Sequence, residues 1–242
     1  MKTHNSYDRI AKFYDDVIGR SFEPAFFLKE LINKYSSNVT SLLELGCGTG
    51  GILEVLSRDY DVTGVDLSDE MLKIARKKIP VASFSKQSMV DFKLNKKFDA
   101  VICVYDTVNH LTKFSEWKKL FRNVYKHLNH SGIFLFDINT ISKLDNLAYL
   151  SSFVEKFNEN YLVINVKKLG KNLYDWELKV FENIQNGEYR LHVENIKEVS
   201  FPIKNIKDEL KKKFIIKKTL TEESKRVSGN SDRVYFVCKK KN

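Results

Sequence analysis

A glycine-rich turn directly after a short apolar run constrains this chain more than any other feature. Residues 43–51 read Leu-Glu-Leu-Gly-Cys-Gly-Thr-Gly-Gly, and the apolar run Ser41–Leu45 leads into them. A strand that turns sharply into a helix needs glycine, which adopts left-handed backbone conformations without strain. The predicted helix over 51–58 offers free N–H groups at its start to an anionic ligand group. The pattern therefore predicts a small-molecule site at this turn.

An acidic residue closes the next predicted strand, which covers 62–65. A carboxylate at Asp66 can accept hydrogen bonds from both hydroxyls of a ribose. The turn is ambiguous by itself, because Gly46, Gly48 and Gly51 also fit the G-x-G-x-x-G pattern of dinucleotide sites. The choice between NAD and another nucleoside cofactor therefore needs further residues.

Strand-like and helix-like segments alternate up to about residue 140, which favours a parallel sheet covered by helices. Further strands are predicted at 81–85, 100–104 and 132–138. Helices are predicted at Asp69–Lys78, with Ser68 as N-cap, and at 114–128. This part of the chain is typical of an α/β domain.

The pattern changes to alternating apolar and polar residues from about residue 153 to 201. Three period-two runs cover 161–166, 173–181 and 189–199, and Asn186-Gly187 predicts a hairpin turn between the last two. A basic helix over 206–213 and two strands, 215–221 and 233–239, follow. We therefore predict a core made of 1–149 and 201–242, interrupted by an antiparallel β insertion of three or four strands at 150–200.

Composition narrows the class of protein only slightly. Hydrophobic residues make up 43% of the chain and charged residues 30%, as in ordinary globular proteins. No stretch approaches the roughly 20 apolar residues of a membrane-spanning helix, and the N-terminus has no apolar signal region. The three cysteines, Cys47, Cys103 and Cys238, lack metal or disulfide spacing. We expect a cytoplasmic protein with no metal site and no membrane contact.

Three segments together resemble the class I methyltransferases that use S-adenosylmethionine (SAM). They are Glu44 two places before the first glycine, the segment 65–72 (Val-Asp-Leu-Ser-Asp-Glu-Met-Leu), and the segment 97–101 (Lys-Phe-Asp-Ala-Val). The opening segment 7–15 and the closing segment 231–237 are similar to those of small-molecule members of this class, including sugar-amine N-methyltransferases. The resemblance implies a Rossmann-like α/β fold: a seven-stranded, mostly parallel sheet that ends in an antiparallel hairpin.

The resemblance also implies a set of SAM-binding residues. In the family, the first acid and the glycine turn hold the methionyl end of SAM, the acid after the second strand holds the ribose, and apolar side chains pack on the adenine. An aromatic residue of the N-terminal segment covers the cofactor. The corresponding residues here are Glu44, Gly46, Cys47, Gly48 and Gly50; Asp66; Leu67 and Met71; and Tyr14, with Tyr7 as a second candidate. Ser88 stands where relatives usually have an aspartate that binds the adenine amino group, and the neighbouring Met89 amide is expected to assist.

The loop after the strand at 100–104 supplies the candidate catalytic residues Tyr105, Asp106 and His110. Ligands of open α/β sheets bind beyond the carboxyl ends of the strands, so this loop faces the transferring methyl group. Some sugar-amine N-methyltransferases have a histidine at this place, which implies a base or an acceptor-orienting group. A histidine that only caps the following helix fits the sequence equally well.

We expect methyl transfer to nitrogen or oxygen of a small-molecule acceptor held between the core and the β insertion. The net charge of +10 keeps an RNA, DNA or protein acceptor open. Against a nucleic acid, the loop lacks the Asn/Asp-Pro-Pro-aromatic motif, and Cys103 is not followed by proline. A non-catalytic SAM-binding protein is the third alternative. The acceptor and the oligomeric state do not follow from the sequence.

Overall fold

The computed structural model describes residues 7–18, 22–150, 152–185, 187–221, 223 and 225–241, and it contains two β-sheets. The strands of the larger sheet are β1 (Ser41–Leu45), β2 (Asp61–Asp66), β3 (Ser83–Lys86), β4 (Phe98–Cys103), β5 (Leu128–Asn139), β10 (Phe214–Leu220) and β11 (Arg233–Lys240). Their order is β10-β11-β5-β4-β1-β2-β3, and β11 alone runs opposite to the other strands of this sheet. This confirms the predicted seven-stranded α/β sheet with an antiparallel pair at its end.

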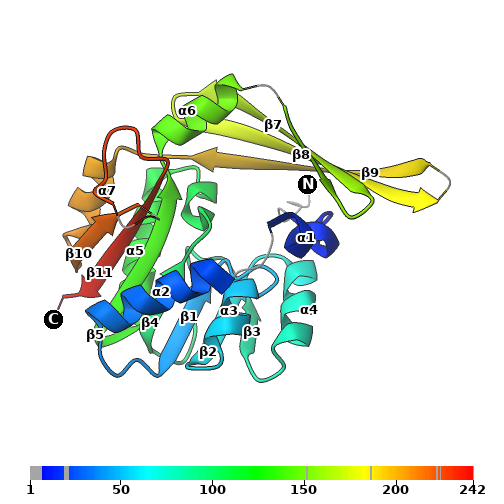
Figure 1. The fold of residues 1–242 in the computed structure, drawn as a ribbon. Helices are drawn as coiled ribbons and strands as arrows, with labels where there is room; N and C mark the ends of the chain where they lie inside the picture. The colour runs from blue at the N-terminus through cyan, green and yellow to red at the C-terminus, as the bar shows by residue number, and fades with distance from the viewer. Residues whose placement is uncertain are drawn as a thin grey trace.

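Helices cover both faces of this sheet (Figure 1). They are α2 (Phe22–Tyr35), α3 (Gly51–Leu56), α4 (Asp69–Lys78), α5 (Phe114–His127) and α7 (Ile203–Leu210). Successive strand residues point to opposite faces, so Leu42 packs with α2 and α3, while Leu43 packs with α5 and α7. Both leucines are fully buried, which explains why β1 reads as a continuous apolar run.

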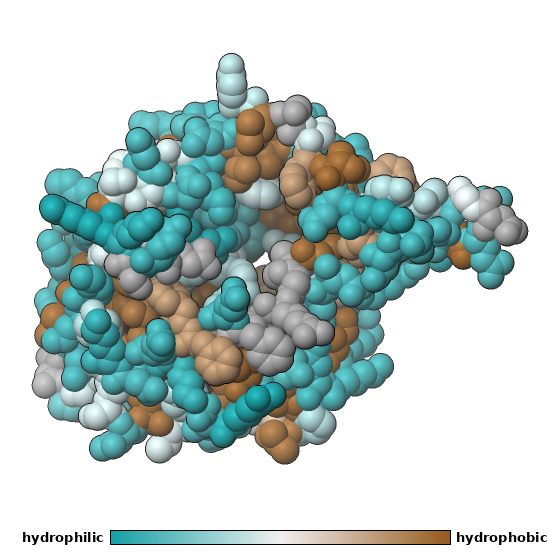
Figure 2. Space-filling model, viewed as in Figure 1, coloured by the Kyte–Doolittle hydropathy of each residue, from teal (hydrophilic) through white to brown (hydrophobic). Residues whose placement is uncertain are grey.

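The second sheet is an antiparallel arm that projects beyond the core (Figure 1). Its strands are β6 (Phe153–Phe157), β7 (Asn160–Gly170), β8 (Leu173–Gln185) and β9 (Glu188–Val199), and we call them the β lobe. Gln185 pairs with Glu188 across the turn where the hairpin was predicted, and Gly187 has a φ of 81°. Asn186 lies outside the described residues. The visible surface of the arm is mostly hydrophilic (Figure 2).

The first described segment, residues 7–18, lies between the β lobe and the core (Figure 1). It contains the short helices η1 (Ala11–Phe13) and α1 (Tyr14–Ile18). Ile10 and Phe13 pack against apolar side chains of the lobe, and Phe13 is 6.1 Å from Phe157 between ring centroids. We call this segment the N-terminal cover.

Several element boundaries differ from those predicted. The third strand begins at Ser83 instead of 81, and Val81 lies in a turn with 88% of its surface exposed. The basic helix covers Ile203–Leu210, because Pro202 is its N-cap and keeps an extended backbone with a ψ of 131°. No helix in the described part of the chain is long and apolar enough to cross a membrane.

Candidate functional site

The β1–α3 turn has the conformation that its glycines predict. Gly46, Gly48 and Gly50 have φ values of 70°, 52° and 80°, which side chains rarely tolerate. A Cβ atom at Gly46 would lie 2.2 Å from the Thr107 methyl group, so the turn and the loop after β4 fit together only because Gly46 has no side chain. Gly50 instead lets α3 approach Ala75 of α4.

Asp66 at the end of β2 fixes the glycine turn. Its carboxylate accepts hydrogen bonds from the backbone N–H of Gly48 (2.9 Å) and of Ser68 (2.8 Å). Burial raises the pKa of Asp66, although these two hydrogen bonds oppose the rise. Ser68 caps α4 as predicted, since its hydroxyl accepts the Met71 N–H at 3.1 Å. The carboxylate oxygens keep lone pairs for a ligand hydroxyl.

Glu44 is a buried carboxyl group whose Oε2 atom has no hydrogen-bond partner among the described residues. Burial, and then the charge of Asp66, raise its pKa well above the usual range. Such an orphaned acceptor needs a donor. The glycine turn, Glu44 and Thr49 line a cavity of about 30 Å³, the loop cavity. The methionyl end of SAM carries an ammonium group. Such a group in the loop cavity would donate a hydrogen bond to the Oε2 atom of Glu44.

A second cavity of about 120 Å³ lies beside Asp66, and we call it the Asp66 cavity. Its walls include Leu67, Met71 and Met89, all of which were predicted to contact adenine. Ser88 does not line it, because its hydroxyl accepts the N–H of Val90 at 3.2 Å. Gln87, which the sequence reasoning missed, lines this cavity instead.

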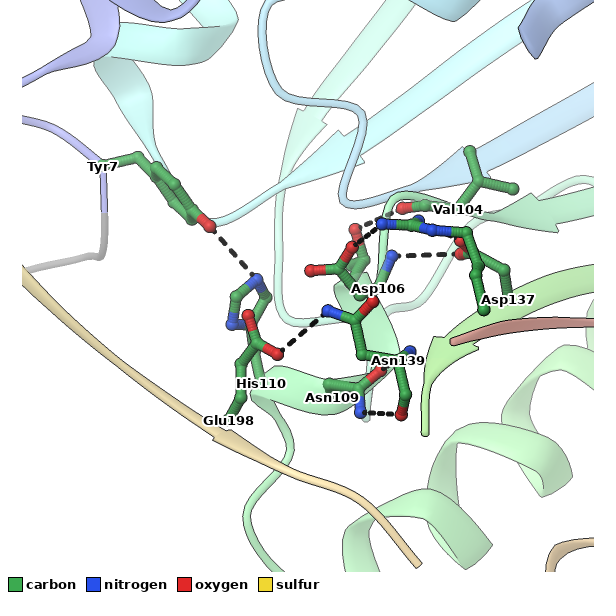
Figure 3. A network of polar contacts seen from close by, with 10 residues as sticks. Tyr7, Val104, Asp106, Asn109, His110, Asp137, Asn139 and Glu198 are labelled. Carbon is green, nitrogen blue, oxygen red and sulfur yellow. Dashed lines mark hydrogen bonds and ion pairs between the residues drawn. The ribbon is translucent and has the colours of Figure 1, made fainter. Parts of the chain in front are cut away.

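The loop after β4 holds its side chains in an unusual backbone conformation. Tyr105 and Asp106 both have positive φ, 56° and 50°, which costs free energy for residues other than glycine and marks functional sites. Arg233 donates to Asp106 at 2.5 Å and also pairs with Asp137, while Asp137 accepts the backbone N–H of Asp106 at 3.0 Å (Figure 3). These contacts hold the strained turn in place.

Asn109 anchors the same loop to both β5 and the lobe. It lies in the short helix η2 (Thr107–His110), and its amide donates to the carbonyl oxygens of Asn139 (3.0 Å) and Val199 (2.9 Å). Its own carbonyl accepts the Asn139 N–H at 3.0 Å (Figure 3). The end of β9 is therefore fixed against the carboxyl ends of β4 and β5.

The third and largest of these cavities, about 350 Å³, lies between the N-terminal cover, the core and the β lobe. We call it the lobe cavity. The lobe lines it with apolar and aromatic side chains: Leu162, Ile164, Trp176, Leu178, Val180 and Ile196. The core and the end of β9 line it with polar groups: Asp106, Asn139, Lys143, Glu198 and Arg233. A ligand with an apolar body and a polar end fits such walls.

Two tyrosines connect the three cavities. Tyr14 and Tyr105 line the loop cavity, the Asp66 cavity and the lobe cavity alike. Tyr7, also in the N-terminal cover, lines the last two and contacts Tyr14 edge to face, with ring centroids 5.6 Å apart. Burial raises the pKa values of Tyr7 and Tyr14, so both phenols stay neutral. The junction of the cavities is therefore aromatic.

His110 lines the Asp66 cavity and not the lobe cavity. Its Nε2 atom lies 3.4 Å from the Tyr7 hydroxyl (Figure 3). Burial lowers its pKa, although the charge of Asp106 acts in the opposite direction. The ring is thus neutral at pH 7 and faces the same space as Asp66.

Sequence reasoning found Asp106 but missed its partners. Arg233 belongs to the closing segment, which was recognised only as the last strand. Glu198 belongs to the insertion, where the alternation of apolar and polar residues was used only to predict strands. The polar residue in an otherwise alternating strand end was the available signal for Glu198. Lys143 follows the helix cap Thr140 in α6 (Ile141–Tyr149), which was not predicted.

Comparisons with known proteins identify the family. Residues 42–132 match the family described as "Methyltransferase domain". A protein of Geobacillus sp. (strain WCH70) whose name describes it as a methyltransferase is 28% identical to this chain. The match covers 97% of this chain and all of that protein. A dTDP-3-amino-3,4,6-trideoxy-alpha-D-glucopyranose N,N-dimethyltransferase of Streptomyces venezuelae is 33% identical over 44% of this chain and 45% of its own length.

Among solved structures, a SAM-dependent methyltransferase from Clostridium acetobutylicum ATCC 824 superposes with a TM-score of 0.87 at 25% identity. The match covers 98% of this chain and 99% of that one. These similarities agree with the order of the strands and with the glycine turn between Glu44 and Asp66, since all of them indicate the same class of enzyme. The chain is a class I SAM-dependent methyltransferase.

Proposed function

We propose that this enzyme moves the methyl group of SAM to nitrogen or oxygen of a small-molecule acceptor bound in the lobe cavity. One observation carries the proposal: the lobe cavity meets the loop cavity and the Asp66 cavity, which we call the SAM-side cavities, at Tyr14 and Tyr105. A reacting atom at this junction would reach the methyl group from the side opposite to sulfur. Methyl transfer demands that alignment before anything else.

The proposed SAM contacts follow the three cavities. Glu44, Gly46, Cys47 and Gly48 would hold the methionyl end, with Gly50 shaping the turn behind them. Asp66 would bind the ribose, and Leu67, Met71 and Met89 would enclose the adenine, with Gln87 in the place expected for Ser88. When bound, SAM supplies an electrophilic methyl group on a sulfonium cation. The faces of Tyr14 and Tyr105 favour a cation at the junction.

The proposed domain roles assign SAM to the core, 1–149 and 201–242, and the acceptor to the β lobe within 150–200. Apolar walls that enclose about 350 Å³ support a small molecule over a macromolecule. The Streptomyces venezuelae relative acts, by its name, on a nucleotide-linked amino sugar, which supports an amine as the first acceptor to test. His110, on the SAM side, would orient the reacting groups through Tyr7.

The test is the release of S-adenosylhomocysteine from SAM with a panel of acceptors. The panel contains dTDP-3-amino-3,4,6-trideoxyglucose, its 3-hydroxy counterpart, bulk tRNA and a protein extract. Transfer to one of the small molecules, with a mass gain of one or two methyl groups, supports the proposal. Transfer to tRNA or protein alone, or SAM binding without transfer to any member, contradicts it.

A further inference from the structure

The polar end of the lobe cavity contains a carboxyl group that the proposed function does not yet use. Glu198 is the penultimate residue of β9 and is only 3% exposed. Asn139 donates a hydrogen bond to its Oε2 atom at 3.3 Å (Figure 3). The lobe thus delivers one acidic side chain to the carboxyl edge of the core sheet.

Asp106 is a second carboxyl group in the same wall of the cavity. Its Oδ1 atom accepts from Arg233 at 2.5 Å, and its backbone is held by Asp137. Arg233 is shared by these two aspartates. Hence Asp106 is fixed and ionised. Glu198 instead accepts its hydrogen bond from the neutral side-chain amide of Asn139.

Two neighbouring buried carboxyl groups do not ionise equally. Burial first, and then the charge of Asp106 and a hydrogen bond to it, raise the pKa of Glu198 well above its usual range. The pairing with Arg233 outweighs burial at Asp106 and lowers its pKa. The other charged or titratable groups nearby are Lys143, Asp137, His110 and Tyr7. The charge of Lys143 favours the ionised form of Glu198, but burial lowers the pKa of Lys143 itself. Glu198 therefore has the higher proton affinity of the pair.

We propose that Glu198 takes up the proton that the acceptor's nitrogen or oxygen loses for methylation, with Asp106 as the fixed charge that keeps Glu198 basic. The inference rests on the proposed function. In the step, the acceptor's N–H or O–H bond breaks and its proton forms an O–H bond on ionised Glu198. The lone pair left on the acceptor forms the bond to the methyl carbon as the methyl–sulfur bond breaks, and that electron pair stays on sulfur.

The geometry explains why this group stands on the lobe side of the junction. Glu198 and Asp106 both line the lobe cavity, whereas His110 lines the Asp66 cavity. A base must reach the acceptor and not the cofactor. A carboxylate whose pKa is raised is also a better base than an ordinary one. The lobe then supplies chemistry as well as apolar walls.

The first experiment needs no acceptor. Glutamate labelled with ¹³C at the carboxyl carbon is incorporated into the full chain saturated with S-adenosylhomocysteine, and the Glu198 signal is assigned by its loss in Glu198→Gln. We expect Glu198 to titrate well above the ordinary pKa of about 4.3. Asp106→Asn should lower that midpoint by at least one pH unit. Titration near pH 4 in the unmodified protein overturns the inference.

The second experiment measures turnover with dTDP-3-amino-3,4,6-trideoxyglucose. Glu198→Gln keeps the size and the Asn139 contact, and should lower kcat by about 10²–10⁴-fold with the SAM dissociation constant within about twofold. Glu177→Gln, on β8 and outside the residues that line the lobe cavity, is the matched control and should be unchanged. In Asp106→Asn, the acidic limb of the kcat profile should move to lower pH together with the Glu198 midpoint.

The outcomes separate the two claims. If the wild-type enzyme is active and Glu198→Gln stays within threefold of it, the inference fails while the proposed function stands. If the wild-type enzyme binds SAM but methylates no small molecule, the proposed function fails and the inference with it. Equal melting temperatures of the variants exclude misfolding as the cause of a loss.

Discussion

Replacing Asp66 by alanine gives the sharpest test of the cofactor site. Two hydrogen bonds from ribose hydroxyls to this carboxylate, at about 1.5–3 kcal/mol each, correspond to a loss of about 3–6 kcal/mol. The carboxylate oxygens already accept the N–H groups of Gly48 and Ser68, which reduces the part available to the ligand. We therefore expect at least a tenfold rise in the SAM dissociation constant, measured by calorimetry.

The same change has a second, independent effect on the free protein. Without the carboxylate, two partly buried N–H groups lose their acceptor, at a cost of about 1–3 kcal/mol each. Urea unfolding should therefore show Asp66→Ala to be less stable, whereas Asp69→Ala, in the exposed first turn of α4, should change both measurements little. Unchanged SAM affinity in Asp66→Ala, or tight binding of NAD by the wild-type protein, would refute the assignment.

Three further predictions concern other parts of the molecule. At Asp99, hydrogen bonds from Asn129, Thr40 and Ser41 outweigh burial and lower the pKa to about 2. This stabilisation, about 1 kcal/mol after solvent screening, should be present above pH 4 and lost toward pH 2, and urea unfolding of Asp99→Ala should lack that pH dependence. His110→Asn should raise the SAM dissociation constant severalfold with kcat within tenfold; a 10²–10⁴-fold fall in kcat would make His110 the base instead. Phe13→Ala removes a buried ring worth about 3–5 kcal/mol, and should speed amide hydrogen exchange in residues 7–18; unchanged exchange would contradict the packing.

The parts of the fold with local signals were predictable from the sequence. The turn needs glycine for its backbone, Ser68 caps its own helix, and the hydrophobic period of residues 114–128 shows directly which side of α5 is buried. These features depend on neighbours within a few positions. Helix α2 was not predicted, although Glu23 and Pro24 in its first turn are signals of this kind.

The polar end of the lobe cavity could not be predicted in the same way. Asp106, Glu198 and Arg233 are separated by long stretches of chain. They meet only because the end of β9 contacts Asn139 of β5, the residue that pairs with Arg233 of β11. Glu198 interrupts the apolar alternation of its strand, but this local signal does not show which residues its carboxyl group meets. Ser88 shows the converse, because a place in a motif did not fix where the side chain points.

The N-terminal cover joins the cofactor side and the acceptor side of the site physically. On the core side, the Ser68 hydroxyl donates to Asp8, and Thr49 donates to Asp15 at 2.5 Å. On the lobe side, the N–H of Arg9 donates to Glu194 at 3.2 Å. Because Tyr7 and Tyr14 belong to this same segment, any opening of the cover breaks the aromatic junction and loosens both halves together. We therefore expect these contacts of the N-terminal cover to be needed for aligning the methyl group and the acceptor. We also expect the β lobe to influence SAM binding through them, although the lobe lines neither SAM-side cavity.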